Sequence, residues 1–65
     1  MAGVDELLTV AEVAAELRQS AYTVRLVIRR GDLKAIRVGR SKRGEYRIRR
    51  SAFDTYLAER ETAAA

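Results

Sequence analysis

The sequence contains neither cysteine nor histidine. Without cysteine the chain has no disulfide framework, no thiolate metal site and no cysteine nucleophile. Without histidine it lacks the most common general base and the most common transition-metal ligand. No apolar run approaches the ~20 residues that span a bilayer, and residues 1–8 lack a signal-peptide pattern. We therefore expect a cytoplasmic protein that is not an enzyme, with no cofactor, no metal, no small-molecule substrate and no membrane contact.

The chain is also short, at 65 residues. A chain of this size forms one small domain and buries only about 60% of the surface that its unfolded form exposes. That leaves no room for a catalytic cleft between domains. We expect a single domain over residues 1–65, with a core over about residues 7–60 and a frayed tail over residues 61–65.

Charge is abundant but strongly separated along the chain, and the formal net charge is +4. Residues 1–17 hold four acids and no base, residues 18–50 hold twelve bases and two acids, and residues 51–65 hold three acids and one base. A face that is only solvated carries mixed signs. Double-stranded DNA is therefore the expected partner, and an acidic protein or a lipid surface is the alternative.

Two helices are expected in the first half of the chain. Thr9 and Glu12 have the spacing of a capping box, and apolar residues follow at helical spacing over residues 10–17. Ser20 is a good N-cap for a second helix over about residues 21–30. A short turn between them, and bases on the outer face of the second, indicate a helix-turn-helix.

After these helices the apolar period changes from 3.6 to 2. Ile36 and Val38 flank a basic residue, and so do Tyr46 and Ile48, which predicts two strands of a β-hairpin with a shared apolar inner face. Arg37 and Arg47 are expected on its outer face. The basic loop between the strands, residues 39–44, is expected to form a wing.

A third helix is expected to begin at Ser51 and to end at about Glu61. Phe53, Tyr56 and Leu57 are spaced to form its buried face. The predicted fold class is therefore α+β: a small winged helix-turn-helix with three short helices and a two-stranded β-hairpin wing.

The second helix carries the candidate base-reading side chains. Tyr22, Arg25 and Arg29 share one face, where a helix in the major groove meets base edges and phosphates. Ser20 and the first backbone N–H groups can bind a phosphate at the helix N-terminus. Leu26 on the same face could contact a thymine methyl or a neighbouring protein, or be a simply exposed leucine. The alternative for the whole face is an ordinary solvated surface.

Basic residues outside this helix have two expected roles. At the wing tip, Arg40, Lys42 and Arg43 can enter a minor groove, where narrow A·T-rich stretches concentrate negative potential. A basic hairpin with no fixed partner is the alternative for this segment. Other bases are better suited to neutralise phosphates than to read sequence, and these are Arg18, Arg30, Arg37, Arg47, Arg49 and Arg50.

The segments "LLTVAEVAAEL", "SAYTVRLVIRRGDLKAIRVGR" and "YRIRRSAFDTYL" cover about residues 7–58. Together they resemble the excisionase-type winged helix-turn-helix family, which is related in fold to the DNA-binding domains of MerR-type regulators. The resemblance implies that the second helix and the wing bind DNA. Carried over by position, it assigns to the major groove Ser20, Ala21, Tyr22, Thr23, Arg25 and Arg29. It assigns to the wing Arg40, Ser41, Lys42 and Arg43.

The resemblance also implies a function. Excisionases of this family are recombination directionality factors, which bind tandem sites, bend DNA and assist an integrase in excision. The expected partners are then DNA, an integrase and neighbouring copies, with the protein associated with a prokaryotic nucleoid. A small transcriptional regulator at a promoter is the alternative, and a protein-binding adaptor is a further one. The chain departs from the family at the turn before Ser20, where a glycine is usual, and at Leu26, where an arginine is common.

Overall fold

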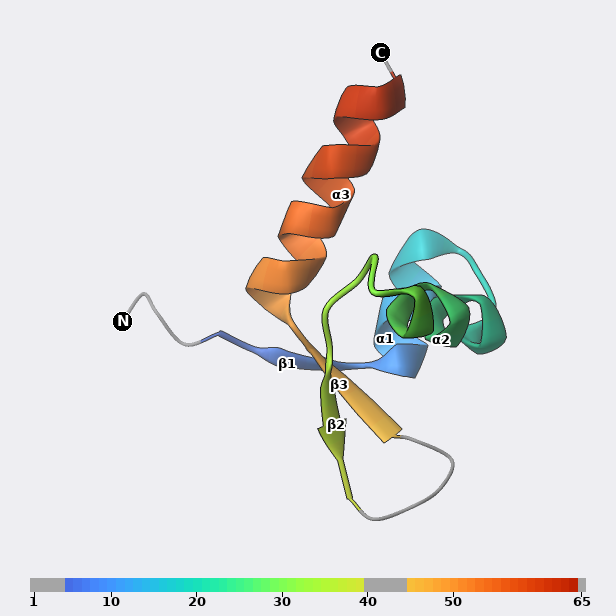
Figure 1. Cartoon of the computed structure of the whole chain (residues 1–65), viewed down its shortest axis with the longest axis vertical. Coiled ribbons are helices and arrows are strands. Elements are labelled where there is room, and N and C mark those ends of the chain that lie inside the picture. Colours follow the sequence, from blue (N-terminus) through green and yellow to red (C-terminus); the bar gives the residue numbers. More distant parts are fainter. Residues whose placement is uncertain (1–4, 40–44, 65) are drawn as a thin grey trace.

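The computed structural model describes residues 5–39 and 45–64, with side chains described as far as residue 61. Three helices and a three-stranded antiparallel sheet make up this part of the chain (Figure 1), which confirms the predicted α+β winged helix-turn-helix class. The elements in chain order are β1 (Leu7–Thr9), α1 (Val10–Leu17), α2 (Ala21–Arg30), β2 (Ile36–Val38), β3 (Glu45–Arg49) and α3 (Arg50–Ala64). Of the helices described, none has the length and apolar character needed to cross a bilayer.

Local hydrogen bonds begin the first two helices where the sequence predicts them. At α1, the Glu12 backbone N–H donates to Thr9 Oγ1 at 3.0 Å, and the Thr9 backbone N–H donates to Glu12 Oε1 at 2.8 Å. This is the expected capping box. At α2, the Thr23 backbone N–H donates to Ser20 Oγ at 3.1 Å. Gly31 ends α2 with a left-handed backbone, φ 86°, which glycine adopts without steric cost.

The turn between α1 and α2 is unusual because Arg18 occupies its left-handed position. Arg18 has φ 56° and ψ 41°, a conformation in which the side chain of an L-residue crowds the backbone. The N–H groups of Arg18 and Gln19 donate to the carbonyls of Ala15 and Ala14 at 3.2 and 3.0 Å. The turn therefore closes in the geometry that glycine favours, with an arginine in its place.

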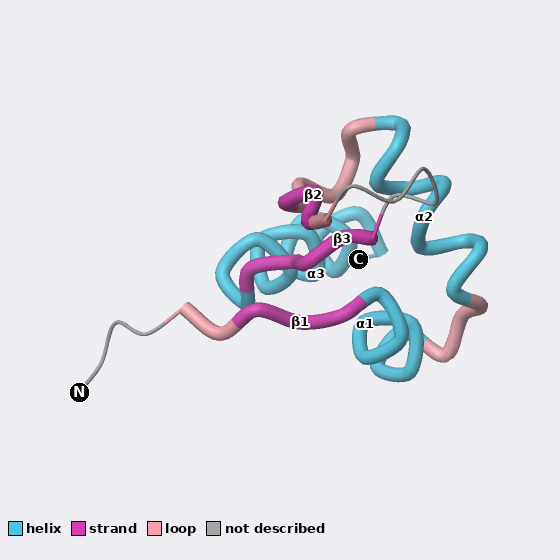
Figure 2. The backbone as a smooth tube through the Cα atoms, turned by 90° about the horizontal axis from the view of Figure 1, so that it is seen from below, coloured by secondary structure: helices cyan, strands magenta, loops and turns pink. Residues whose placement is uncertain are grey.

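The sheet has the order β1-β3-β2, so β3 is its central strand. Strand β1 pairs with β3 through Leu7 opposite Arg49 and Leu8 opposite Ile48. The sequence did not predict β1, because three residues are too few to show a period. Figure 2 shows that β1 leads directly into α1 and that β3 leads directly into α3.

The register of the hairpin corrects the predicted division of its faces. Ile36 lies opposite Arg47, and Arg37 lies opposite Tyr46. Directly opposed residues of an antiparallel pair share a face, so the apolar residues of β2 and β3 lie on opposite faces of the sheet. The reason is the even number of residues in segment 39–44, between the paired Val38 and Glu45. Arg37 therefore shares a face with Tyr46, and Ile36 is left partly exposed.

The core lies between the helices and one face of the sheet. Its fully buried side chains come from both helices of the helix-turn-helix, the segment after α2, strand β3 and helix α3. They are Val13, Val24, Leu33, Ile48 and Phe53. Of the three residues predicted to form the buried face of α3, Phe53 is fully buried, whereas Tyr56 and Leu57 are half-buried.

Helix α3 begins at Arg50, one residue before the predicted start, and continues to Ala64, past the predicted end at about Glu61 and through most of the predicted frayed tail. Its N-terminal cap is supplied from a distant segment. The Ser51 backbone N–H donates to Asp5 Oδ1 at 3.0 Å, and Ser51 Oγ donates to Asp5 Oδ2 at 2.7 Å. The Arg50 backbone N–H donates to the Glu6 carbonyl at 2.8 Å. The side-chain hydrogen bond from Ser51 is the main reason that the pKa of Asp5 lies below its ordinary value of 3.8. The segment before β1 therefore fixes the start of α3.

Candidate nucleic-acid interface

The outer face of α2 presents an aromatic ring and two guanidinium groups to solvent. Tyr22 is 69% exposed, and Arg25 and Arg29 are exposed as well. At about 100° per residue these three side chains fall within roughly 60° of one another around the helix. Val24, on the opposite side, is only 1% exposed. The helix is therefore fixed to the core by one side and offers the other to a partner.

The N-terminus of α2 lies at one end of this face. Ser20 is exposed, whereas Ala21 and Thr23 are half-buried. The hydroxyls of Ser20 and Thr23 lie 3.0 Å apart and share a hydrogen bond. Small side chains at this end let another molecule approach the first backbone N–H groups closely. Leu26 is half-buried, so it is not the simply exposed leucine that was one of the three alternatives.

Arginines of the described chain fall into two groups. One group forms ion pairs: Arg49 with Asp5 at 3.9 Å, Arg50 with Glu16 at 3.0 Å, Arg50 with Asp54 at 3.6 Å, and Arg60 with Asp32 at 3.9 Å. The hydrogen bond to Glu16 is the largest of the contacts that raise the pKa of Arg50 above its usual range. Within residues 5–39 and 45–61, the other group makes no ion pair and consists of Arg18, Arg25, Arg29, Arg30, Arg37 and Arg47.

This second group, which we call the unpaired arginines, coincides with the arginines expected at DNA in α2, in the turn before it and in the hairpin. Arg18, Arg30 and Arg37 are exposed. Arg49 and Arg50, which the sequence also placed among the phosphate-neutralising bases, instead contact acids of the chain. In the described part of the chain, positive charge that makes no ion pair is therefore concentrated on α2 and around it.

A hollow of about 240 Å³ joins α2 to the hairpin. Arg25 from α2 lines it together with Tyr46 and Arg47 from β3, and with the residues that begin α1. The Arg47 side chain is half-buried, and its Nη1 donates to the Tyr46 carbonyl at 3.1 Å. The fold thus brings together Arg25 and Arg47, which are far apart in the sequence.

Four of the expected wing residues lie outside the described part of the chain: Arg40, Ser41, Lys42 and Arg43. The strands that flank them are described. Gly39 follows β2 with a left-handed backbone, φ 76°, and β3 begins at Glu45. The base of the wing is therefore fixed by the pairing of Val38 with Glu45.

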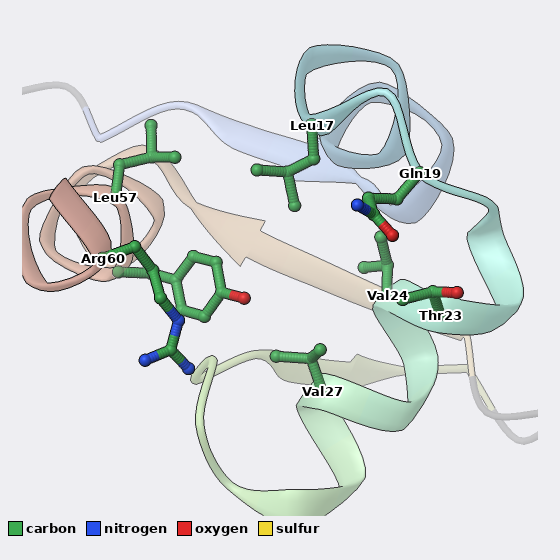
Figure 3. A pocket seen from close by; sticks show the side chains of 8 residues that line it. Leu17, Gln19, Thr23, Val24, Val27, Leu57 and Arg60 are labelled. Atoms are coloured by element: carbon green, nitrogen blue, oxygen red, sulfur yellow. The ribbon is translucent and has the colours of Figure 1, made fainter. Parts of the chain in front are cut away.

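A second groove lies between the helices, away from the unpaired arginines of α2. Its volume is about 240 Å³, and Leu17 of α1, Val27 of α2 and Leu57 of α3 lie around it (Figure 3). Arg60 lies at its side, 4.7 Å above the ring of Tyr56. The ion pair with Asp32 ties α3 to the end of α2 at this point. This groove contributes to the position of α3 and holds one cation, which is already paired.

Comparisons with known proteins bear on the same region. The sequence profile of the helix-turn-helix domain family matches residues 7–61. Two proteins of Mycobacterium tuberculosis, from strains CDC 1551 and H37Rv, are each 58% identical to the chain over 38 residues. The aligned part is 58% of this chain and 49% of each relative, so the chain spans about half the length of the curated relatives it matches. Both carry the name "Putative DNA-binding protein". No solved structure matches the chain.

Proposed function

The chain belongs to the helix-turn-helix domain family of DNA-binding domains, and on this premise we propose that it binds specific duplex DNA through α2 and the wing. The observation that carries the proposal is the set of unpaired arginines. A protein that placed these bases only for solubility would have no reason to pair its other arginines and leave these free. Affinity from phosphate neutralisation and specificity from base contacts then come from one continuous surface.

Within this surface the roles divide by position. Arg25 and Arg29 are proposed to contact guanine O6 and N7 in the major groove, with Tyr22 on the sugar-phosphate backbone. Ser20, Ala21 and Thr23 hold the N-terminus of α2 close to a phosphate. Arg18, Arg30, Arg37 and Arg47 neutralise phosphates on either side. Arg40, Ser41, Lys42 and Arg43 form the part that enters the minor groove.

The biological role proposed is that of an excisionase-like recombination directionality factor. The sequence resembles that family over about residues 7–58, and we place α2 and the wing in two adjacent grooves of the duplex. Copies bound at tandem sites would bend the DNA and assist an integrase in excision, within the nucleoid of a prokaryotic cell. The protein contributes no bond-breaking step of its own.

The test is a footprint of the purified protein across fragments of its own genome, at physiological salt and with random competitor DNA. Several adjacent protected repeats at an integrase attachment site are the expected result. An excision reaction that needs the protein would then establish the role.

Other footprints have different meanings. A single protected site over a promoter would replace recombination by transcriptional regulation and keep the DNA-binding surface. Protection no stronger than that of random DNA would overturn specific binding by α2 altogether, and the basic surface would then belong to an acidic protein partner.

A further inference from the structure

The outer face of the sheet carries two exposed apolar side chains. Leu7 on β1 is 48% exposed and Ile36 on β2 is 36% exposed. The register places Leu7 opposite Arg49 of β3, on the face opposite to the buried Leu8 and Ile48. The third large exposed apolar side chain of the described residues is Tyr22, which lies on α2. Two of the three therefore share a sheet face that the core does not use, on the strands on either side of β3.

A hollow lies beside Ile36, between β2 and the start of α3. It has a volume of about 200 Å³, and the apolar residues that line it are Ala35, Ile36 and Ala52. Lys34 and Arg49 line the same hollow. The Lys34 side chain makes no ion pair within the described segments, and that of Arg49 is 56% exposed despite its pair with Asp5. The hollow accommodates one large apolar side chain between two positive charges.

We propose that this outer sheet face docks an acidic segment of a protein partner, through an apolar anchor flanked by carboxylates. The anchor would fill the hollow against Ile36, and the carboxylates would pair with Lys34 and Arg49. Exposed apolar side chains rimmed by charge are typical of protein interfaces. DNA does not fit as well, because phosphates gain nothing from covering Leu7 and Ile36.

A symmetric pair of copies is also a poor occupant of this face. A two-fold contact would bring Lys34 and Arg49 of one copy against the same cations of the other. Two cations line the hollow, Lys34 and Arg49, and the contact of Arg49 with Asp5 is long, at 3.9 Å. An acidic segment of a different chain therefore complements the hollow. Arg47, which we assign to DNA phosphates, lies opposite Ile36 on the same face. The docking inference concerns the part of this face beside Lys34 and Arg49 and does not depend on the proposed DNA-binding function.

The test uses a fluorescein-labelled peptide of alternating leucine and glutamate, with serine-for-leucine and lysine-for-glutamate peptides as controls. Fluorescence anisotropy measures its binding to the full chain. We expect Ile36→Ser and Lys34→Glu each to weaken binding at least about fivefold. Tyr22→Ser, which removes a more exposed large side chain from α2, and Arg29→Glu should leave it unchanged. Amide shifts in NMR spectra should map the peptide to Leu7, Ile36 and Arg49.

DNA affinity, measured on the same proteins, should fall for Tyr22→Ser and Arg29→Glu and be retained by Ile36→Ser. This opposite pattern separates failure of the docking inference from failure of the DNA-binding proposal. Loss of peptide binding in Arg29→Glu, or its displacement by random duplex DNA, would assign the peptide to α2 and overturn the inference. So would absence of binding, or self-association of the protein that Ile36→Ser abolishes. Lys34→Glu changes an exposed side chain, so it keeps the test valid if Ile36→Ser fails to fold.

Discussion

Arg18 combines a left-handed backbone with a proposed role at DNA phosphates. A left-handed backbone costs a non-glycine residue about 1–2 kcal/mol, whereas glycine costs about 0.5–1 kcal/mol in lost chain entropy. We therefore expect Arg18→Gly to raise the free energy of unfolding by about 0.5–1 kcal/mol. Urea denaturation with a constant m-value measures this change.

Two variants separate backbone strain from charge at this turn. Arg18→Ala removes the charge and keeps the strain, so its stability should stay near that of the wild type. Gln19→Gly adds a glycine where no positive φ requires one, so it should destabilise. If Arg18→Gly is no more stable than Arg18→Ala, strain at Arg18 is not the cause.

Asp5 links the first described residues to α3 in a way that depends on pH. Its pKa is lowered in the folded protein, chiefly by the Ser51 side-chain hydrogen bond. A lowered pKa contributes stability above the unfolded value of about 3.8, and this contribution is lost as the pH falls through the folded value. We therefore expect wild type to be more stable than Asp5→Asn near neutral pH, with the difference shrinking below about pH 4.

Thermal unfolding of both proteins across this pH range checks the expectation. Glu6→Gln is the matched control. Glu6 follows Asp5 in the sequence, and its carboxylate makes no hydrogen bond to the described residues, whereas that of Asp5 bonds Ser51. A stability difference between wild type and Asp5→Asn that is constant with pH would show that charge on Asp5 does not stabilise α3.

At this scale the sequence predicts contacts that are local. The Thr9–Glu12 capping box and the Ser20 cap each join residues three positions apart, so their spacing is visible in the sequence. Asp5 and Ser51 are 46 positions apart. Nothing in the acidic start of the chain indicates that one of its carboxylates caps a helix near the other end, because the sheet brings the two together.

Among the elements, the hairpin shows where periodic patterns stop being informative. Alternation identifies each strand, but the face that a strand presents to the other depends on their register. In this hairpin the register depends on the length of segment 39–44, and an even count places Ile36 opposite Arg47. Alternation therefore predicted the two strands correctly. The prediction that they share an apolar face was wrong, because that depends on the register. The exposed Ile36 that results is the basis of the docking inference.

Helix α2 and the wing are expected to contribute differently to DNA binding. Arg25→Ala should relax specificity, with a loss of about 1–3 kcal/mol on the specific site and little change on random duplex. Replacing Arg40, Lys42 and Arg43 together by glutamine should weaken binding to both kinds of DNA similarly and flatten the salt dependence. Dissociation constants on specific and random duplexes, each at several salt concentrations, measure both effects. Equal losses on the two duplexes for both variants would contradict this division.

On the scale of the whole molecule, charge is distributed in a way that the sequence shows only in part. The excess of bases over residues 18–50 is evident from the chain. The sequence does not show which of those bases remain unpaired. Arg49 and Arg50 meet Asp5, Glu16 and Asp54 only after folding. The acids at both ends of the chain thus neutralise the start of α3, and α2 keeps its charge.

This distribution predicts how single neutralisations change the salt dependence of DNA binding. Each phosphate contact that is lost should reduce the slope of log K against log salt by about 0.9. Arg30→Gln and Arg37→Gln remove unpaired arginines, so each should lower the slope by about that amount. Arg50→Gln and Arg60→Gln remove cations that already pair with acids, so the slope should not change. Binding titrations between low and physiological salt give the four slopes. A shallower slope for Arg50→Gln, with no change for Arg30→Gln, would mean that the DNA lies along α3. The proposal that α2 lies at the centre of the interface would then be wrong.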